Sequence, residues 1–407
     1  MELGRERVGA LGAVRHRDFR LLWTGQTMSM IGDGAFLVAT GWRVVQLTGS
    51  SSSLAILLAL NNVAMLSTLL VGGALADRYP RRLMMIVSDL VRCACVASLA
   101  ALDATGQLSF GIWLALAVVY GLGDGFFQPA FGGIVPLVVE PEAVPSANAL
   151  IGIARNTSFL VGPALAGLLY GVAGSPVVFG ANAATFVVSA LLLLLARPRP
   201  IEPEPSEGTW REIVSGFRYV AGVPWLWVTI SLAAVALMIA WAPFQSLLPA
   251  LTHETFHRGV ASYGTLFAVQ ALGMVGGALL FGQIQPRRHR VVLTYAAYGL
   301  NDICVIVLVV LGSYHAAVVL MVARGALIGW ANALWETILV QLVPENRLSR
   351  VISLDYFGTL GLTPVGFALT AAVAPFFPAA SILLVGYSLA TVLWMAPLAS
   401  RRVRSAA

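Results

Sequence analysis

The chain contains about twelve apolar stretches, each long enough to cross a membrane as a single helix. A helix rises ~1.5 Å per residue, so ~20 residues cross the ~30 Å hydrocarbon core of a bilayer. The apolar residues run on without alternating with polar ones, which favours helices over a membrane β-barrel. The predicted spans are residues 19–46, 53–75, 83–102, 109–135, 147–171, 176–196, 223–250, 260–283, 291–312, 316–342, 350–375 and 380–398. We therefore expect an all-α membrane protein with twelve transmembrane helices.

The scarcity of charge supports the same conclusion. Charged residues make up 11% of the chain and hydrophobic residues 58%, whereas a soluble domain carries roughly 25% charged residues. The first apolar stretch is too long for a cleaved signal peptide, so we interpret it as a span.

Glycines recur along the chain at one offset of 204 residues. The sequence GGAL begins at Gly72 and again at Gly276, and the pair Gly121 and Gly125 returns as Gly325 and Gly329. Duplicated halves that contain such small-xxx-small steps are typical of secondary transporters. The twelve helices are therefore predicted to form two pseudo-symmetric bundles of six.

A polar segment separates the two predicted bundles. Residues 197–208 are rich in proline and charge, and Trp210, Ile213, Val214, Phe217 and Val220 then follow at helical spacing. This pattern predicts an extended linker and a short amphipathic helix on the membrane surface. The predicted domains are an N-terminal segment (1–18), a first bundle (19–196), a linker (197–222), a second bundle (223–398) and a tail (399–407).

The arginines predict the orientation in the membrane. Lysine is absent, so all 25 basic residues are arginine. Twenty of them lie at the two ends of the chain, in the central loop, or after predicted spans 2, 8 and 10. The positive-inside rule then places both termini in the cytoplasm. The expected location is the bacterial inner membrane.

Several motifs resemble those of a known transporter family. Residues 73–82, GALADRYPRR, follow the second span and resemble the loop motif of the major facilitator superfamily. The sequences FRLLW at 19–23, DLVR at 89–92 and QPA at 128–130 are similar to its enterobactin-exporter and macrolide-efflux branch. Residues 162–167, GPALAG, partly resemble the family's antiporter signature. The resemblance implies a twelve-helix transporter that exports a small molecule.

The loop motif is expected to form a cytoplasmic gate. Its residues are Gly73, Asp77, Arg78, Arg81 and Arg82. In the family, the acidic residue contacts the start of helix 11, here near residues 350–354, and the carboxylate of Asp77 suits a helix N-terminus. The alternative is a solvated turn whose charges only set the topology.

Charged residues inside the predicted spans need a reason, because a charge at a helix centre costs about 2.5–3.5 kcal/mol on insertion scales. They are Asp33, Asp124, Arg155, Asp302, Arg324 and Glu336. Helical rise puts Asp302 and Arg324 at similar depth, which favours a buried ion pair. By the same argument from depth, Asp124 is expected either to pair with Arg155 or to carry a proton.

Two of these carboxyl residues, Asp33 and Glu336, are the first candidates for carrying a proton or binding a cation. The resemblance implies that helices 1, 4, 7 and 10 line the central cavity, and both residues lie on these helices. By contrast, Asp89 and Arg92, taken to lie near the cytoplasmic end of helix 3, are interpreted as a packing pair.

Aromatic residues on the same helices suggest a surface for a hydrophobic substrate. The candidates are Phe36, Phe126, Phe127, Trp241, Phe244, Trp330 and Trp335. Ordinary packing between helices is an equal alternative for each of them.

The sequence contains no phosphate-binding GxxxxGK[ST] loop and no His/Cys cluster with metal-ligand spacing. We therefore expect no enzyme, cofactor, metal or nucleic acid, and partners limited to a small-molecule substrate, protons and lipid. The predicted function is proton-coupled efflux of hydrophobic or cationic molecules by a monomer. The alternatives are export of an endogenous siderophore or metabolite and, less favoured, a non-transporting membrane sensor.

Overall fold

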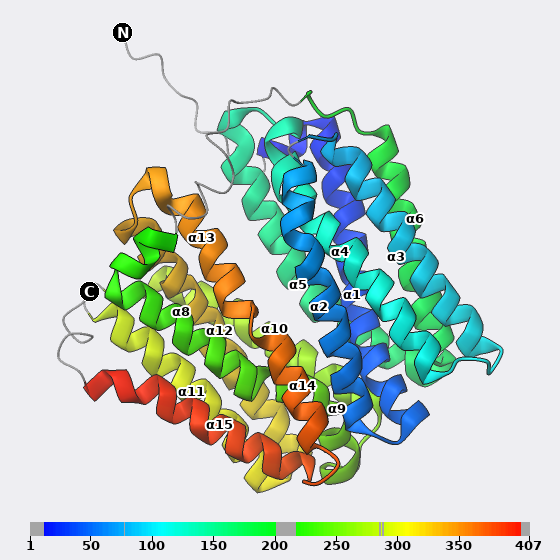
Figure 1. Cartoon of the computed structure of the whole chain (residues 1–407), viewed down its shortest axis with the longest axis vertical. Coiled ribbons are helices and arrows are strands. Elements are labelled where there is room, and N and C mark those ends of the chain that lie inside the picture. Colours follow the sequence, from blue (N-terminus) through cyan, green and yellow to red (C-terminus); the bar gives the residue numbers. More distant parts are fainter. Residues whose placement is uncertain (1–11, 77, 201–216, 285, 287–288, 400–407) are drawn as a thin grey trace. The chain divides into compact units, whose positions relative to one another are not determined.

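The computed structural model describes residues 12–76, 78–200, 217–284, 286 and 289–399. Within these ranges the chain is almost entirely helical and contains no β-strand, as the continuous apolar stretches predict. Figure 1 shows the helices in chain order.

Six long helices precede the central loop. They are α1 (Arg17–Thr48), α2 (Ser51–Ala76), α3 (Arg81–Ala104), α4 (Phe110–Val138), α5 (Val144–Ala173) and α6 (Ser175–Leu195). Short 3₁₀ turns lie at Gly12–Arg15 and Pro141–Ala143.

Six more helical segments follow the loop, and two of them are interrupted. The first consists of α8 (Pro224–Ala236), the π-helical turn η3 (Leu237–Trp241), α9 (Ala242–Ala250) and a second π-helical turn η4 (Leu251–Thr255). The others are α10 (Val260–Gln283), α11 (Arg290–Leu311), α12 (Tyr314–Leu342), α13 (Glu345–Leu360) with α14 (Thr363–Val373), and α15 (Ala379–Met395). A 3₁₀ turn, Ala396–Ala399, ends the described chain.

The helices have the dimensions of membrane spans. Among the described residues, ten are long and apolar enough to cross a membrane. Helix α15 is shorter, with 17 residues, and α1 has 32 residues but carries more charge. With the interrupted segments counted once each, the described residues contain twelve long helical segments. The predicted all-α membrane fold is confirmed.

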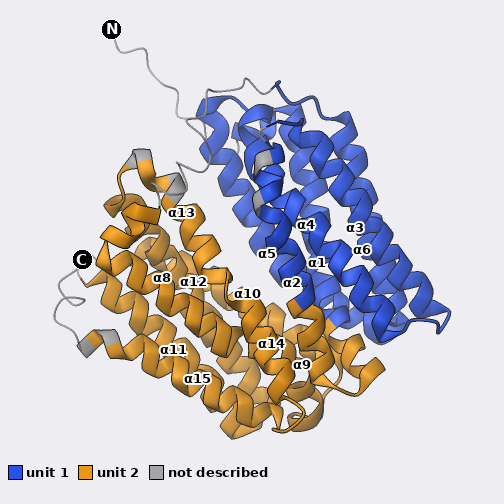
Figure 2. Cartoon of the chain, in the orientation of Figure 1, with its two compact units in different colours: residues 1–40, 60–204 blue, residues 41–59, 205–407 orange. Residues whose placement is uncertain are grey.

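The contacts divide the chain into two compact units (Figure 2). The first contains residues 1–40 and 60–204, and the second contains residues 41–59 and 205–407. In the first unit α3 packs against α4 and α6, and in the second α12 packs against α10 and α11. The bundle boundaries 19–196 and 223–398 stay a prediction.

The four glycines of the repeated small-xxx-small steps pack in the same way in each unit. At all four positions a Cβ atom would meet the backbone of the neighbouring helix at less than contact distance. The opposing carbonyls are those of Asn61 for Gly121, Met65 for Gly125, Gln270 for Gly325, and Met274 for Gly329. The small-xxx-small steps thus let two helices approach closely in both halves.

One predicted span is interrupted for a local reason. The apolar stretch 350–375 forms α13 and α14, with a turn at residues 361–362. Pro364 has no N–H for the carbonyl of Leu360, and the hydroxyl of Thr363 donates to that carbonyl instead, at 2.6 Å. The break thus coincides with a missing backbone hydrogen bond.

Part of the predicted surface helix lies outside the described residues. Residues 201–216 are not described, and residues 217–222 are helical. Most of the predicted N-terminal segment and tail also lies outside the described ranges.

Candidate functional site

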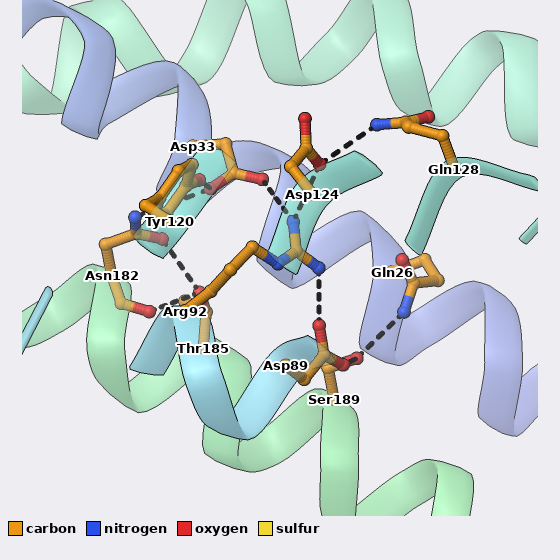
Figure 3. Close-up of polar contacts among 10 residues, drawn as sticks. All are labelled: Gln26, Asp33, Asp89, Arg92, Tyr120, Asp124, Gln128, Asn182, Thr185 and Ser189. Carbon is orange, nitrogen blue, oxygen red and sulfur yellow. Dashed lines mark hydrogen bonds and ion pairs between the residues drawn. The ribbon is translucent and has the colours of Figure 1, made fainter. Parts of the chain in front are cut away.

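A cluster of polar side chains in the first unit lies between membrane-spanning helices (Figure 3). We call it the Arg92 cluster. Its members are Gln26 and Asp33 on α1, Asp89 and Arg92 on α3, Tyr120, Asp124 and Gln128 on α4, and Asn182, Thr185 and Ser189 on α6.

The Arg92 guanidinium is at the centre of this cluster and is almost fully buried. Its Nη2 lies 2.6 Å from Oδ1 of Asp89, one helical turn earlier. Its Nη1 lies 3.4 Å from Oδ1 of Asp124 and 3.9 Å from Oδ2 of Asp33. One arginine thus faces three carboxyl groups.

Two aromatic rings enclose the same guanidinium. Its central carbon lies 4.2 Å from the ring centre of Phe127 on α4 and 4.6 Å from that of Phe186 on α6. Cation–π attraction and close packing both restrict its movement.

Asp89 is the innermost carboxyl, with no exposed surface. Its second oxygen accepts a hydrogen bond from Ser189 at 2.7 Å. Ser189 in turn accepts from the amide of Gln26 at 2.8 Å. This chain of hydrogen bonds satisfies Asp89 and connects α1, α3 and α6.

Asp33 and Asp124 are more accessible, with 34% and 21% of their side-chain surfaces exposed. Asp33 accepts hydrogen bonds from Tyr120 at 3.0 Å and from Asn182 at 3.4 Å. Asp124 accepts one from Gln128 at 3.1 Å. Both carboxyls therefore combine polar neighbours with access from outside the bundle.

A glycine makes room for one of these contacts. A Cβ atom on Gly32 would collide with the side chains of Asn182 and Thr185. Because Gly32 has none, Asn182 reaches Asp33, the next residue on α1.

The second unit contains a different polar group around Arg324 of α12, which is also buried. Its Nη1 donates to Gln270 of α10 at 2.6 Å, and its Nη2 donates to Tyr387 of α15 at 3.3 Å. Its guanidinium carbon lies 4.2 Å from the ring centre of Phe244 on α9. Its direct hydrogen-bond partners are thus neutral.

The expected ion pair between Asp302 and Arg324 does not form as a direct contact. Asp302 accepts a hydrogen bond from Asn301 at 2.9 Å, and Arg324 is occupied by Gln270 and Tyr387. Depth along two neighbouring helices predicts proximity, but the direction of each side chain decides the contact.

The alternative pairing of Asp124 with Arg155 was wrong. Arg155 is exposed on α5, and Asp124 contacts Arg92 of α3 instead. The interpretation of Asp89 and Arg92 as a pair near a helix end also needs correction. They are paired, but Arg92 lies midway along α3 (Arg81–Ala104).

Glu336, the other predicted proton carrier, is exposed on α12 and does not belong to the Arg324 group described above.

The predicted aromatic residues divide into two kinds. Phe127 and Phe244 are buried against arginines, so their rings serve packing. Phe36 is stacked on Tyr120, with 5.5 Å between ring centres. Phe126, Trp241, Trp330 and Trp335 are half-buried. A substrate-contacting role for these five stays a prediction.

The loop motif is described in part, because Asp77 lies outside the described residues. Arg81 donates to the carbonyls of Ala76 and Gly133, and Arg82 donates to the carbonyl of Leu194 at 2.7 Å. Arg78 is exposed, and a Cβ atom on Gly73 would meet nothing within 4 Å. Two of the motif's arginines therefore hold carbonyls near the ends of α2, α4 and α6.

Sequence reasoning missed the neutral members of the cluster. Gln26, Asn182 and Ser189 are buried polar residues in apolar helices. A polar residue within an apolar stretch is the one sequence feature that could have identified them. Among the described residues, no group of three or more His, Cys, Asp or Glu side chains is arranged to hold a metal ion.

Comparison with known proteins identifies relatives over most of the chain. The model of the Major Facilitator Superfamily matches residues 22–362. The enterobactin exporter EntS of Salmonella paratyphi A (strain ATCC 9150 / SARB42) is 28% identical over 389 residues, which covers 93% of this chain and 91% of that protein. EntS of Escherichia coli O1:K1 / APEC is 27% identical, and the match covers 93% of this chain and 92% of that protein.

Solved structures show the same fold at low sequence identity. A bacterial homologue of the iron transporter ferroportin, in an inward-facing state, has a TM-score of 0.72 and 17% identity, with 93% of this chain and 98% of that chain covered. A point mutant of the nucleoside transporter NupG has a TM-score of 0.74 and 12% identity, with 94% of this chain and 99% of that chain covered.

Proposed function

The chain belongs to the Major Facilitator Superfamily of membrane transporters, and we propose that it exports hydrophobic or cationic small molecules in exchange for protons. Transport by alternating access is the family's mode of action. The direction of transport is supported by the exporter relatives.

The observation that carries the proposal is the pair of accessible carboxyls beside Arg92. A charged Asp at the centre of a membrane helix costs about 2.5–3.5 kcal/mol, so such residues usually serve transport. Asp33 and Asp124 both lie in spanning helices, and both retain exposed surface. A carboxyl in this position can take up a proton from water and release it again.

A cationic or hydrophobic substrate suits this site. The carboxylates of Asp33 and Asp124 attract a cation, and the half-buried ring of Phe36 offers apolar contact nearby, stacked on Tyr120. Glu336 stays a second candidate for cation or proton binding in the other unit.

Export of an endogenous siderophore or secondary metabolite is the alternative substrate proposal. The observation in its favour is that the curated relatives are enterobactin exporters. A substrate panel containing ethidium, erythromycin, chloramphenicol and enterobactin separates the two.

The distribution of arginine supports an inner-membrane location with both termini in the cytoplasm. The Asp77 loop would then close the cytoplasmic side, and Asp77→Asn is expected to insert normally but transport slowly. A monomer suffices for this proposal. Cysteine labelling of the two termini from either side of the membrane tests the orientation.

The decisive experiment measures uphill efflux in proteoliposomes under an imposed pH gradient. Asp33→Asn, Asp124→Asn and Glu336→Gln keep the side-chain shape and remove the titration. For Asp33 and Asp124 we expect loss of uphill transport of the neutral probe chloramphenicol, with its binding and downhill exchange retained. Asp103→Asn is the matched control, because Asp103 is a buried carboxyl of α3 that accepts from Ser175 instead.

Two results would change the proposal. Variants that lose ethidium transport but still drive chloramphenicol uphill would make the carboxyls substrate contacts, not proton carriers. Unaltered uphill efflux in both Asp variants would remove the site from the mechanism.

A further inference from the structure

The Arg92 cluster contains more negative than positive charge. With all carboxyls ionised, one guanidinium would face three carboxylates between membrane-spanning helices. The titratable or charged groups here are Asp33 of α1, Asp89 and Arg92 of α3, and Tyr120 and Asp124 of α4, whereas α6 contributes the neutral Asn182, Thr185 and Ser189. Uncompensated charge is costly in this environment, so the cluster is suited to hold a proton.

Asp89 occupies the Nη2 side of the guanidinium. Its contact with Nη2 is the shortest of the three, at 2.6 Å, and it is completely buried. Ser189 and Gln26 hold it from α6 and α1. A charge-assisted pair with this burial and these hydrogen bonds is held in one geometry.

The other side of the guanidinium is shared. The same nitrogen, Nη1, lies within ion-pair distance of Asp124 and of Asp33. The rings of Phe127 and Phe186 lie against the guanidinium. Arg92 therefore stays in place while its two outer partners compete for Nη1.

We propose that Arg92 is a positioning residue that makes Asp33 and Asp124 share a single proton. The carboxyl that is paired with Nη1 stays ionised, and the other carboxyl takes the proton from water. The proton returns to water when the site opens on the opposite side, so no further reactant is needed. This inference rests on the proposed function, because it assigns the proton site of that exchange.

The test measures protonation directly and needs no substrate. Infrared difference spectra of the purified full-length protein, between alkaline and acidic pH, report the carbonyl band of protonated carboxyl groups. The variants are Asp33→Asn, Asp124→Asn, their combination and Arg92→Gln, with Asp103→Asn as control. In either single Asp variant the remaining carboxyl pairs with Arg92 and stays ionised.

We expect each single variant to lose the same band, the double variant to lose no more, and the control to retain it. In Arg92→Gln neither carboxyl has a cation, so both hold protons and the band grows about twofold. Two separate bands that disappear additively would overturn the proposal, and so would a band that depends on one Asp alone. The single Asp variants keep the Arg92–Asp89 pair, so they decide the question even if Arg92→Gln does not fold.

The two proposals fail in different ways. A shared band without pH-driven efflux of any probe would contradict the proposed function and leave the shared proton standing. Proton-driven efflux with additive bands would support the proposed function and contradict the shared proton.

Discussion

Arg92 in the first unit and Arg324 in the second are both buried, and each guanidinium lies 4.2 Å from a phenylalanine ring centre. Neither Nε has a hydrogen-bond partner among the described residues. Their other contacts differ, because Arg92 faces three carboxyls and Arg324 faces the neutral oxygens of Gln270 and Tyr387. A buried cation thus supports a titratable site in one half and a neutral hydrogen-bond network in the other.

The repeat shows how the halves diverge. Gly121 and Gly325 are equivalent under the 204-residue offset, so Tyr120 occupies the position equivalent to Arg324. Tyr120 donates to Asp33, whereas Arg324 bonds to Gln270 and Tyr387. The glycines keep the backbones close in both halves, while the neighbouring side chain decides what the polar group can do.

The largest expected difference between the halves is in stability. Arg92→Met strands the buried Asp89 carboxylate and should lower the free energy of unfolding by about 3–5 kcal/mol. Arg324→Met leaves the neutral acceptors Gln270 and Tyr387 without their donor and should cost about 1–3 kcal/mol. Denaturant unfolding in detergent, followed by tryptophan fluorescence, measures both. Equal losses would mean that Asp302 depends on Arg324 as strongly as Asp89 depends on Arg92.

The glycine steps should behave alike in the two halves. Gly125→Ala and Gly329→Ala each force a methyl group against a neighbouring backbone and should cost about 1–3 kcal/mol. Gly73→Ala and Gly276→Ala are the controls, one in each half but not equivalent under the repeat, since nothing lies within 4 Å of the added Cβ at either position. We expect the controls to change stability by less than about 0.5 kcal/mol. A large loss in one half alone would show that the repeat does not preserve packing.

Double-mutant cycles sharpen the contrast between the arginines. Asp89→Asn and Arg92→Gln remove the two sides of one contact, so their coupling energy should reach about 0.5–3 kcal/mol. The losses from Asp302→Asn and Arg324→Gln should add within about 0.5 kcal/mol, because no direct ion pair joins these residues. Strong coupling in the second cycle would restore the ion pair that helix depth predicts.

The smallest expected effect is that of Arg155→Gln. Arg155 is exposed, and Asp124 has Arg92 as its partner. Stability should change by no more than about 0.5 kcal/mol, and efflux in proteoliposomes should be unaltered. A loss of transport would make Arg155 a functional partner in a state other than this one.

The fold follows from local patterns in the chain. Each apolar stretch specifies its own helix, because a helix satisfies its backbone hydrogen bonds within one segment. Family membership also follows from short motifs, such as the GALADRYPRR loop at residues 73–82. The break between α13 and α14 coincides with a local feature, Pro364, although the apolar pattern alone concealed it.

The candidate site was predicted only in part. Asp33 and Asp124 are recognisable in the sequence as charges inside apolar helices, but their common partner is not. Arg92 is 59 residues from Asp33 and 32 from Asp124 in the chain. Nothing in the local sequence indicates which of its neighbours a long side chain will reach.

The sequence by itself determined the helices, the repeated halves and the family, because hydrophobic patterns act within single helices and the glycine and loop motifs are visible directly along the chain. Only the tertiary structure decided which charges meet. Gln26, Asp33, Arg92, Asp124 and Ser189 come together because α1, α3, α4 and α6 pack side by side. Ion pairs and hydrogen bonds depend on side-chain direction over a few ångströms, and packing sets that direction.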